Sequence, residues 1–152
     1  MPLPLLLLPG SLCTDLLFQA QISFFKGHRE VIVASFFNCD SIEAMATKVL
    51  NEAPEEFALA GLSMGGIVAF EMFRQAPQRI NRIALLDTNP RGELPEDLPI
   101  RHQQINNVTE GGVDRLKTLV SQQLMPKYAF DPEQVLQLEP LVMKMALDVG
   151  AD

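Results

Sequence analysis

Apolar residues fall in four short runs along the chain, at 3–8, 31–37, 57–60 and 80–86. Within these runs the apolar residues are mostly consecutive rather than alternating with polar ones. Strands of a parallel sheet that are covered on both faces show this pattern. We therefore expect four strands.

The segments between these runs have the spacing of helices. Residues 15–25 and 41–52 repeat apolar positions every three or four residues, and a third helix-like segment extends from Ile67 to about Gln75. Asp40 with Glu43 resembles a capping pair that opens the second segment. Strands that alternate with helices in this way predict an α/β fold, with a mostly parallel sheet and helices on both faces.

The rhythm changes after Asp87, where the sequence predicts helices at 98–108, 113–124 and 132–147 with no strand between them. Their apolar positions recur three and four residues apart, which is typical of amphipathic helices. We therefore expect residues 1–90 to form a strand and helix core, and residues 91–152 to form an all-helical segment.

Composition restricts the function further. The 152 residues carry 12 basic and 19 acidic side chains, a net charge of −7, which argues against nucleic-acid or anionic-membrane partners. Cys13 and Cys39 are too few for a disulfide framework. The N-terminal apolar run is short and follows no basic residue, so we interpret it as a buried strand rather than a signal peptide. These features favour a cytoplasmic protein.

No pattern for a cofactor appears in the sequence. The glycines do not form a G-x-x-x-x-G-K-[ST] phosphate loop, and two distant histidines with two cysteines have no metal-ligand spacing. We therefore expect neither a nucleotide nor a metal.

One stretch carries candidate chemistry, Gly61-Leu62-Ser63-Met64-Gly65-Gly66, between a buried strand and a helix. A G-x-S-x-G pattern at such a junction needs glycine on both sides of the serine, because a Cβ there would collide with the neighbouring element. The turn then holds the serine hydroxyl clear of the sheet. The alternative is a glycine-rich turn without chemistry.

With the opening strand leading into Pro9-Gly10-Ser11-Leu12 and the strand at 80–86 ending at Asp87, this context resembles the α/β-hydrolase fold family over nearly the whole chain. The resemblance implies a serine esterase or acyl hydrolase acting on carboxylic ester, thioester or related acyl bonds of small molecules. Ser63 would form the acyl-serine intermediate, and residues 91–152 would begin a helical lid.

The resemblance also implies an oxyanion hole made of two backbone N–H groups. One is that of Met64, the residue after the nucleophile. The other comes from the loop after the first strand, where Pro9-Gly10 stands at the usual His-Gly; this indicates Ser11, with Leu12 as the near alternative.

The general base is harder to identify. In the family the triad follows the order nucleophile, acid, histidine. His28 precedes Ser63 in a turn, and His102 is more typical of a histidine on a helix surface. Asp87 is a candidate acid, although most relatives place the acid one strand later; the alternative is that its side chain caps the turn that follows.

The family resemblance therefore implies an N-terminal part of a longer fold. The sheet of the family continues with at least two more strand and helix units that carry the acid and the histidine, roughly 60 residues. Without these C-terminal core strands, residues 80–86 would be an exposed sheet edge, and we expect the chain alone not to be catalytically competent. The alternatives are a non-catalytic binding module, a decayed fragment, or a separate chain that supplies the missing strands.

Overall fold

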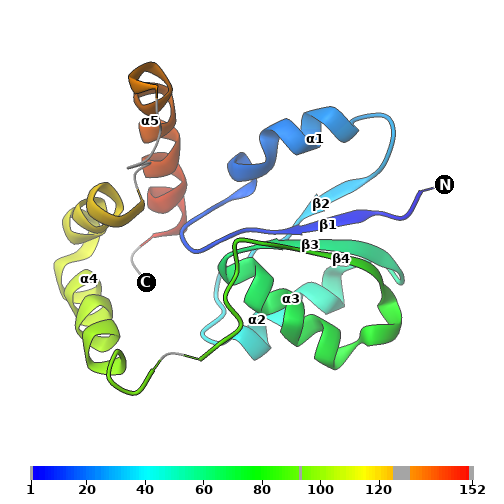
Figure 1. The fold of residues 1–152 in the computed structure, drawn as a ribbon, viewed down its shortest axis with the longest axis horizontal. Coiled ribbons are helices and arrows are strands. Elements are labelled where there is room, and N and C mark those ends of the chain that lie inside the picture. Colours follow the sequence, from blue (N-terminus) through cyan, green and yellow to red (C-terminus); the bar gives the residue numbers. More distant parts are fainter. Residues whose placement is uncertain (1, 93, 125–130, 151–152) are drawn as a thin grey trace. The chain divides into compact units, whose positions relative to one another are not determined.

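The computed structural model describes residues 2–92, 94–124 and 131–150. Contacts divide the chain into a sheet unit, residues 1–11 and 17–90, and a helical unit, residues 12–16 and 91–152. The sheet unit contains four parallel strands in the order β2-β1-β3-β4 (Figure 1). Their bounds are β1 Leu5–Leu8, β2 Val31–Val33, β3 Phe57–Leu62 and β4 Ile80–Leu86.

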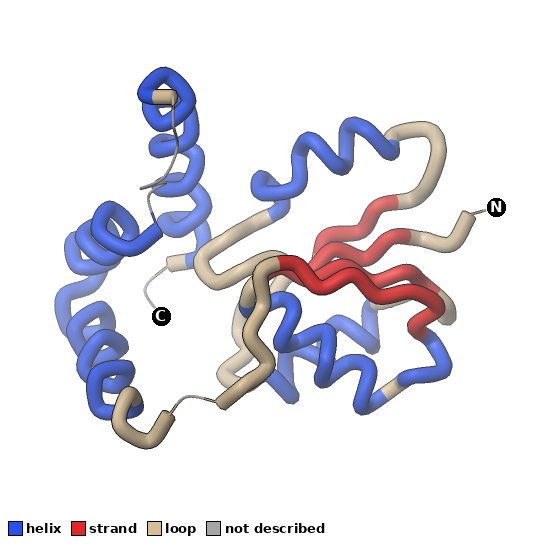
Figure 2. The backbone as a smooth tube through the Cα atoms, in the orientation of Figure 1, coloured by secondary structure: helices blue, strands red, loops and turns tan. Residues whose placement is uncertain are grey.

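Helices cover both faces of this sheet. A 3-10 turn at Asp15–Phe18 leads into α1 (Gln19–Phe25) on one face. The other face carries α2 (Ile42–Glu52) and α3 (Met64–Gln75), and a second 3-10 turn at Pro77–Arg79 leads into β4. The three helices and the red strands between them are plain in Figure 2. The predicted α/β fold class is confirmed.

The main core lies between the sheet and the pair α2 and α3. Alternate residues of a strand point to opposite faces, so Leu6, Phe57 and Leu59 meet Val49 and Met72 on the α2 and α3 side. A smaller cluster on the α1 side is built on Leu7, Phe18 and Ala60. Since β1 and β3 contribute to both clusters, the continuous apolar runs are explained by burial on two faces.

Two local predictions need correction. The strand β2 ends at Val33 rather than at residue 37, because it pairs with β1 alone and the last link to that strand is from Ala34 N–H to Leu7 C=O. The cap of α2 is Ser41 rather than Asp40: its Oγ accepts a hydrogen bond of 3.2 Å from the Ala44 N–H, and its backbone is extended.

The strand β4 is an edge of the sheet, as expected for a four-stranded arrangement. Only its first residue is buried; Ile83, Leu85 and Leu86 are 41%, 38% and 45% exposed. Apolar side chains therefore remain uncovered on both faces of this strand.

The helical unit consists of α4 (Leu98–Leu119), a π-helical turn (Val120–Leu124) and α5 (Pro132–Val149). Gly112, with φ of 56°, interrupts α4, so the two helices predicted at 98–108 and 113–124 follow one another across a kink. Leu116, Val120 and Ala146 form the centre of its core. Its role as a lid stays a prediction. Among the described residues, no helix is long and apolar enough to cross a membrane.

Candidate active site

Ser63 occupies the turn between β3 and α3 in an unusual conformation. Its φ of 52° and ψ of −117° lie in a region that side-chain-bearing residues rarely adopt. Such a residue persists only where its surroundings hold it, and cases of this kind cluster at functional sites. The Ser63 side chain is exposed, as the sequence pattern predicts for a serine presented by a sharp turn.

Close contacts explain the glycines on both sides of this serine. A Cβ on Gly61 would come within 3.0 Å of the carbonyl of Gly65. A Cβ on Gly65 would approach the carbonyl oxygens of Leu8 and Pro9 as closely. Both obstacles are backbone atoms, which cannot move aside as a flexible side chain can. The two glycines therefore allow α3 to begin directly against β1 and β3.

The first turn of α3 leaves N–H groups beside the serine. The carbonyl of Ser63 accepts hydrogen bonds from Gly66 N–H at 2.9 Å and from Ile67 N–H at 3.3 Å. In the described part of the sheet unit, the N–H groups of Met64 and Gly65 have no acceptor, as is usual for the first residues of a helix. A donor at Met64, next to the candidate nucleophile, suits an oxyanion hole.

The loop after β1 lies against this turn. Ser11 Oγ donates a hydrogen bond to the sulfur of Met64 at 3.4 Å. The structure thus brings together the two residues that the family resemblance names as sources of oxyanion-hole donors. Leu12, the alternative to Ser11, has a φ of 56°.

Asp87 directly follows β4 and has a φ of 43°. It lies beside the elbow, the strand-to-helix turn at residues 61–66, because the Ser63 N–H donates a 2.9 Å hydrogen bond to the carbonyl of Leu86. Its carboxylate is exposed. The next residue, Thr88, links the turn after β4 to the Ser63 turn, since Thr88 Oγ1 donates a hydrogen bond to the Ser63 carbonyl at 2.7 Å. The role of Asp87 as an acid stays a prediction.

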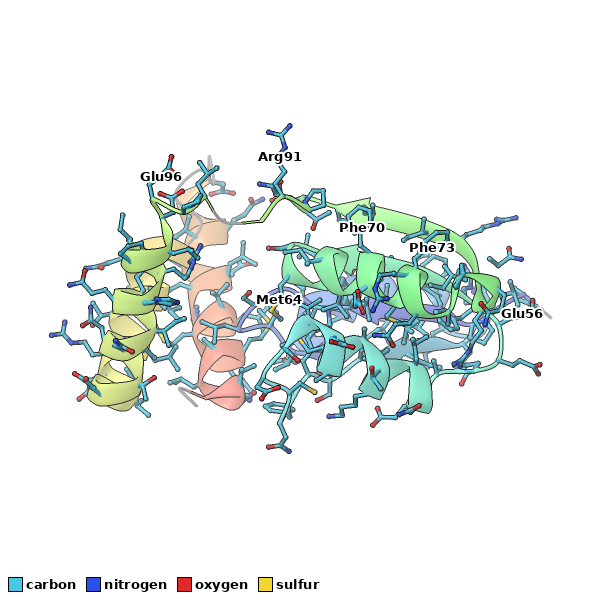
Figure 3. All side chains as sticks on the ribbon, turned by 90° about the horizontal axis from the view of Figure 1, so that it is seen from below. Glu56, Met64, Phe70, Phe73, Arg91 and Glu96 are labelled. Atoms are coloured by element: carbon cyan, nitrogen blue, oxygen red, sulfur yellow. The ribbon has the colours of Figure 1, made fainter. Side chains whose placement is uncertain are left out.

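His28 is at the wrong end of the sheet for catalysis. It lines a hollow of about 400 Å³ together with Leu3, Ala58 and Asn81, which lie at the amino ends of their strands. Ser63 follows the carboxyl end of β3, five residues beyond Ala58, a separation of about 16 Å along an extended strand. Figure 3 shows the two ends of the sheet through Glu56, just before β3, and Met64, just after it.

The remaining candidate groups are a second histidine, a cysteine and possible metal ligands. His102 lies exposed on α4 in the helical unit. Burial raises the pKa of the Cys13 thiol, so this cysteine stays protonated and weakly nucleophilic at neutral pH. Within the described residues no cluster of histidine, cysteine or carboxylate side chains could hold a metal ion.

Thr88 is the site residue that the sequence pattern did not reveal. A signal existed in Gly66, a third glycine that the G-x-S-x-G pattern does not require. A Cβ at Gly66 would come within 3.0 Å of the Thr88 side chain. An extra glycine at such a turn therefore indicates a close neighbour from another strand.

Comparison with known proteins finds esterases among the relatives of the chain. No family model matches the chain. Residues of the chain are 31% identical, over 91 residues, to a pimeloyl-(acyl-carrier protein) methyl ester esterase from Klebsiella pneumoniae subsp. pneumoniae, covering 55% of the chain and 35% of that enzyme. The enzyme of the same name from Legionella pneumophila strain Corby is 27% identical over 139 residues, 85% of the chain and 58% of that enzyme.

Solved structures share the fold. A thermophilic esterase from Thermogutta terrifontis superimposes with a TM-score of 0.75 at 22% identity, over 99% of this chain and 61% of that one. The chain thus spans between about one third and three fifths of the length of these three proteins. At 22% identity the structural match shows only that the fold is shared.

Proposed function

The chain has the α/β-hydrolase fold, and from this premise we propose that it carries the nucleophile half of a serine hydrolase. In this proposal Ser63 attacks an ester, thioester or related acyl bond of a small-molecule substrate and forms an acyl-serine intermediate. The acidic composition and the two cysteines are the basis for proposing a cytoplasmic location.

The observation that carries the proposal is the conformation of Ser63. A positive φ, an exposed side chain and glycines in contact with backbone atoms on both sides occur together at one strand-to-helix turn. A turn that served packing alone would not need a strained serine at its apex. The two curated relatives named as esterases support the same reaction class.

Acyl transfer at Ser63 proceeds in steps for which this chain supplies some of the groups. A base takes the hydroxyl proton as Oγ bonds to the acyl carbon. The negative charge that develops on the acyl oxygen is held by the backbone N–H groups of Met64 and, in our assignment, Ser11. The leaving group departs with a proton, and water then releases the acid and restores the Ser63 hydroxyl.

The base is the missing group. The sheet unit holds a single histidine, His28, which lies at the far end of the sheet from Ser63. We propose that further strands beside β4 bring the histidine and the acid, with Asp87 as an alternative acid. The uncovered Ile83 and Leu85 support this proposal, because a paired and covered strand would bury them.

A non-catalytic binding module is the second candidate. It is favoured by one observation: within the described residues of the sheet unit, no imidazole or carboxylate hydrogen-bonds to Ser63. A fold that had lost its triad would retain the same elbow and the same contacts.

The experiment compares the rate of p-nitrophenyl acetate hydrolysis by the 152-residue chain with the rates of its Ser63→Ala and His102→Ala variants. We expect the unsubstituted chain to match Ser63→Ala, since within the described part of the sheet unit no imidazole or carboxylate hydrogen-bonds to Ser63. Turnover that disappears in both variants would identify His102 as the base and overturn the proposal of further strands. Turnover that needs Ser63 but not His102 would place an unidentified base within the chain.

A further inference from the structure

Thr88 belongs to the Ser63 turn although it comes from a different strand end. Its side chain fills the space beside Gly66, where an added Cβ would come within 3.0 Å of Thr88 Cβ, Oγ1 and Cγ2. The Thr88 side chain is half-buried, whereas Asp87 before it is exposed. The residue that packs beside Gly66 is therefore Thr88, one position beyond the candidate acid Asp87.

The hydroxyl of Thr88 reaches the nucleophile's own backbone. Thr88 Oγ1 donates to the Ser63 carbonyl oxygen at 2.7 Å, the usual length of an O–H···O hydrogen bond. The N–H groups of Gly66 and Ile67 donate to the same oxygen. Two of these donors come from α3, which follows Ser63 directly, and only Thr88 joins the carbonyl to the neighbouring strand.

The last residue of β4 and Thr88, two positions beyond it, thus hold Ser63 at both of its peptide groups. The Ser63 N–H donates to the Leu86 carbonyl at 2.9 Å, and the Ser63 carbonyl accepts from Thr88. Between these two bonds lies the rare backbone conformation with φ of 52°. Bonds on both sides of a strained residue are what keeps it from relaxing to a more common conformation.

We propose that Thr88 is a positioning residue, which sets the direction of the residue 63 side chain by holding the residue 63 carbonyl. This inference rests on the proposed function of Ser63 as the nucleophile. Thr88 itself touches no reacting atom. A threonine that only completed the turn after β4 would affect stability and leave the chemistry of residue 63 unchanged.

The test replaces the nucleophile with a reporter that needs no catalytic base. In Ser63→Cys, the thiol lies at the start of α3, where a helix N-terminus lowers a cysteine pKa below about 8.5. Its alkylation by iodoacetamide is followed from pH 6 to 10 by mass spectrometry of the peptide that contains residue 63. Reading this peptide alone keeps Cys13 and Cys39 out of the measurement.

Three chains are compared: Ser63→Cys alone, with Thr88→Val, and with Thr88→Ser. Valine keeps the shape beside Gly66 and removes the hydroxyl, whereas serine keeps the hydroxyl. We expect Thr88→Val to slow alkylation at pH 7 by about two- to tenfold, the effect of one lost hydrogen bond, and to shift the pH profile upward. With Thr88→Ser, the alkylation rate and the pH profile should match those of Ser63→Cys alone.

Equal rates and pH profiles for Thr88→Val and its parent would overturn the inference, even if Thr88→Val unfolds more easily. A loss in Thr88→Ser as large as in Thr88→Val would also overturn it. If the valine variant does not fold, Thr88→Ala provides the same comparison. Alkylation requires no esterase turnover, so an inactive chain still reports on Thr88, and failure of the proposed function is seen separately.

Discussion

The neighbouring strands β3 and β4 pair in parallel but differ in burial. In β3 the first five of six residues are buried, whereas in β4 only Ile80 is buried and the six residues after it are exposed. Each strand is followed by a non-glycine residue with positive φ, which is Ser63 after β3 and Asp87 after β4. The candidate nucleophile is thus presented by a packed strand, and the candidate acid by a largely exposed one.

The same difference in burial separates the surroundings of Ser63 from those of Asp87. The turn at Ser63 is held by backbone contacts to β1 and by α3 on the covered side of the sheet. Just before Asp87, by contrast, Leu85 and Leu86 of β4 are 38% and 45% exposed. We infer that the nucleophile side of the site is preorganised, while the base and acid side depends on further elements beside β4.

The largest expected effect is on the elbow itself. Gly65→Ala introduces a Cβ against the carbonyl oxygens of Leu8 and Pro9, so we expect it to lower the free energy of unfolding by about 3–5 kcal/mol. Gly92→Ala is the matched control, because a Cβ there meets no atom within 4 Å; its effect should stay within about 0.5 kcal/mol. Urea denaturation measures both. Equal effects would mean that the elbow is not tightly packed.

The second comparison uses one register pair on one face of the sheet, Leu59 of β3 and Ile83 of β4. Leu59 is 1% exposed and Ile83 is 41% exposed. Leu59→Ala should lower the free energy of unfolding by about 2–5 kcal/mol through a buried cavity. Ile83→Ala should lower it by about 1 kcal/mol or less, since water already reaches the side chain. Similar losses would show that β4 is covered in solution, for example by a second copy of the chain.

The smallest effect concerns the network on α3, the helix that covers β3. Arg74 and Gln75 hydrogen-bond to the Glu71 carboxylate and lower its pKa to about 2 from 4.5. A lowered pKa means that the ionised carboxylate stabilises the fold above about pH 4.5 and that this contribution is lost as the pH falls toward 2.

Glu71→Gln should therefore reduce the dependence of thermal stability on pH between pH 4.5 and 2. Glu52→Gln, at an exposed position on α2, is the control that removes a carboxylate from the same unit. Melting temperatures followed by circular dichroism across this range are the measurement. A pH dependence reduced equally in both variants would mean that the α3 network contributes nothing specific.

Local patterns were sufficient for much of the fold. The bounds of β4 and the end of α3 at Gln75 agree with the prediction, because turns and a proline mark them in the sequence. The end of β2 could not be predicted, since it depends on the register with β1, in which Val33 pairs with Leu7. Nor could the choice of Ser41 over Asp40 as the helix cap, because both residues are good caps.

The candidate site likewise has parts that a local sequence pattern predicts and parts that depend on distant residues. Ser63 and the flanking glycines form a local pattern whose purpose can be stated from sterics alone. Thr88 acts across 25 residues of sequence, and only the structure shows that its hydroxyl meets the Ser63 carbonyl. The sequence already argued against His28, because it precedes Ser63 in the chain, and the structure adds that it lies at the opposite end of the sheet.

The decisive measurement is reaction of a fluorophosphonate with the full product of the reading frame that encodes these residues, with the adduct located by mass spectrometry. The reagent forms a stable bond only with an activated serine. Our account predicts one adduct, on Ser63, that disappears in Ser63→Ala. A cooperatively folded product that forms no adduct, or forms it on another residue, would contradict the account.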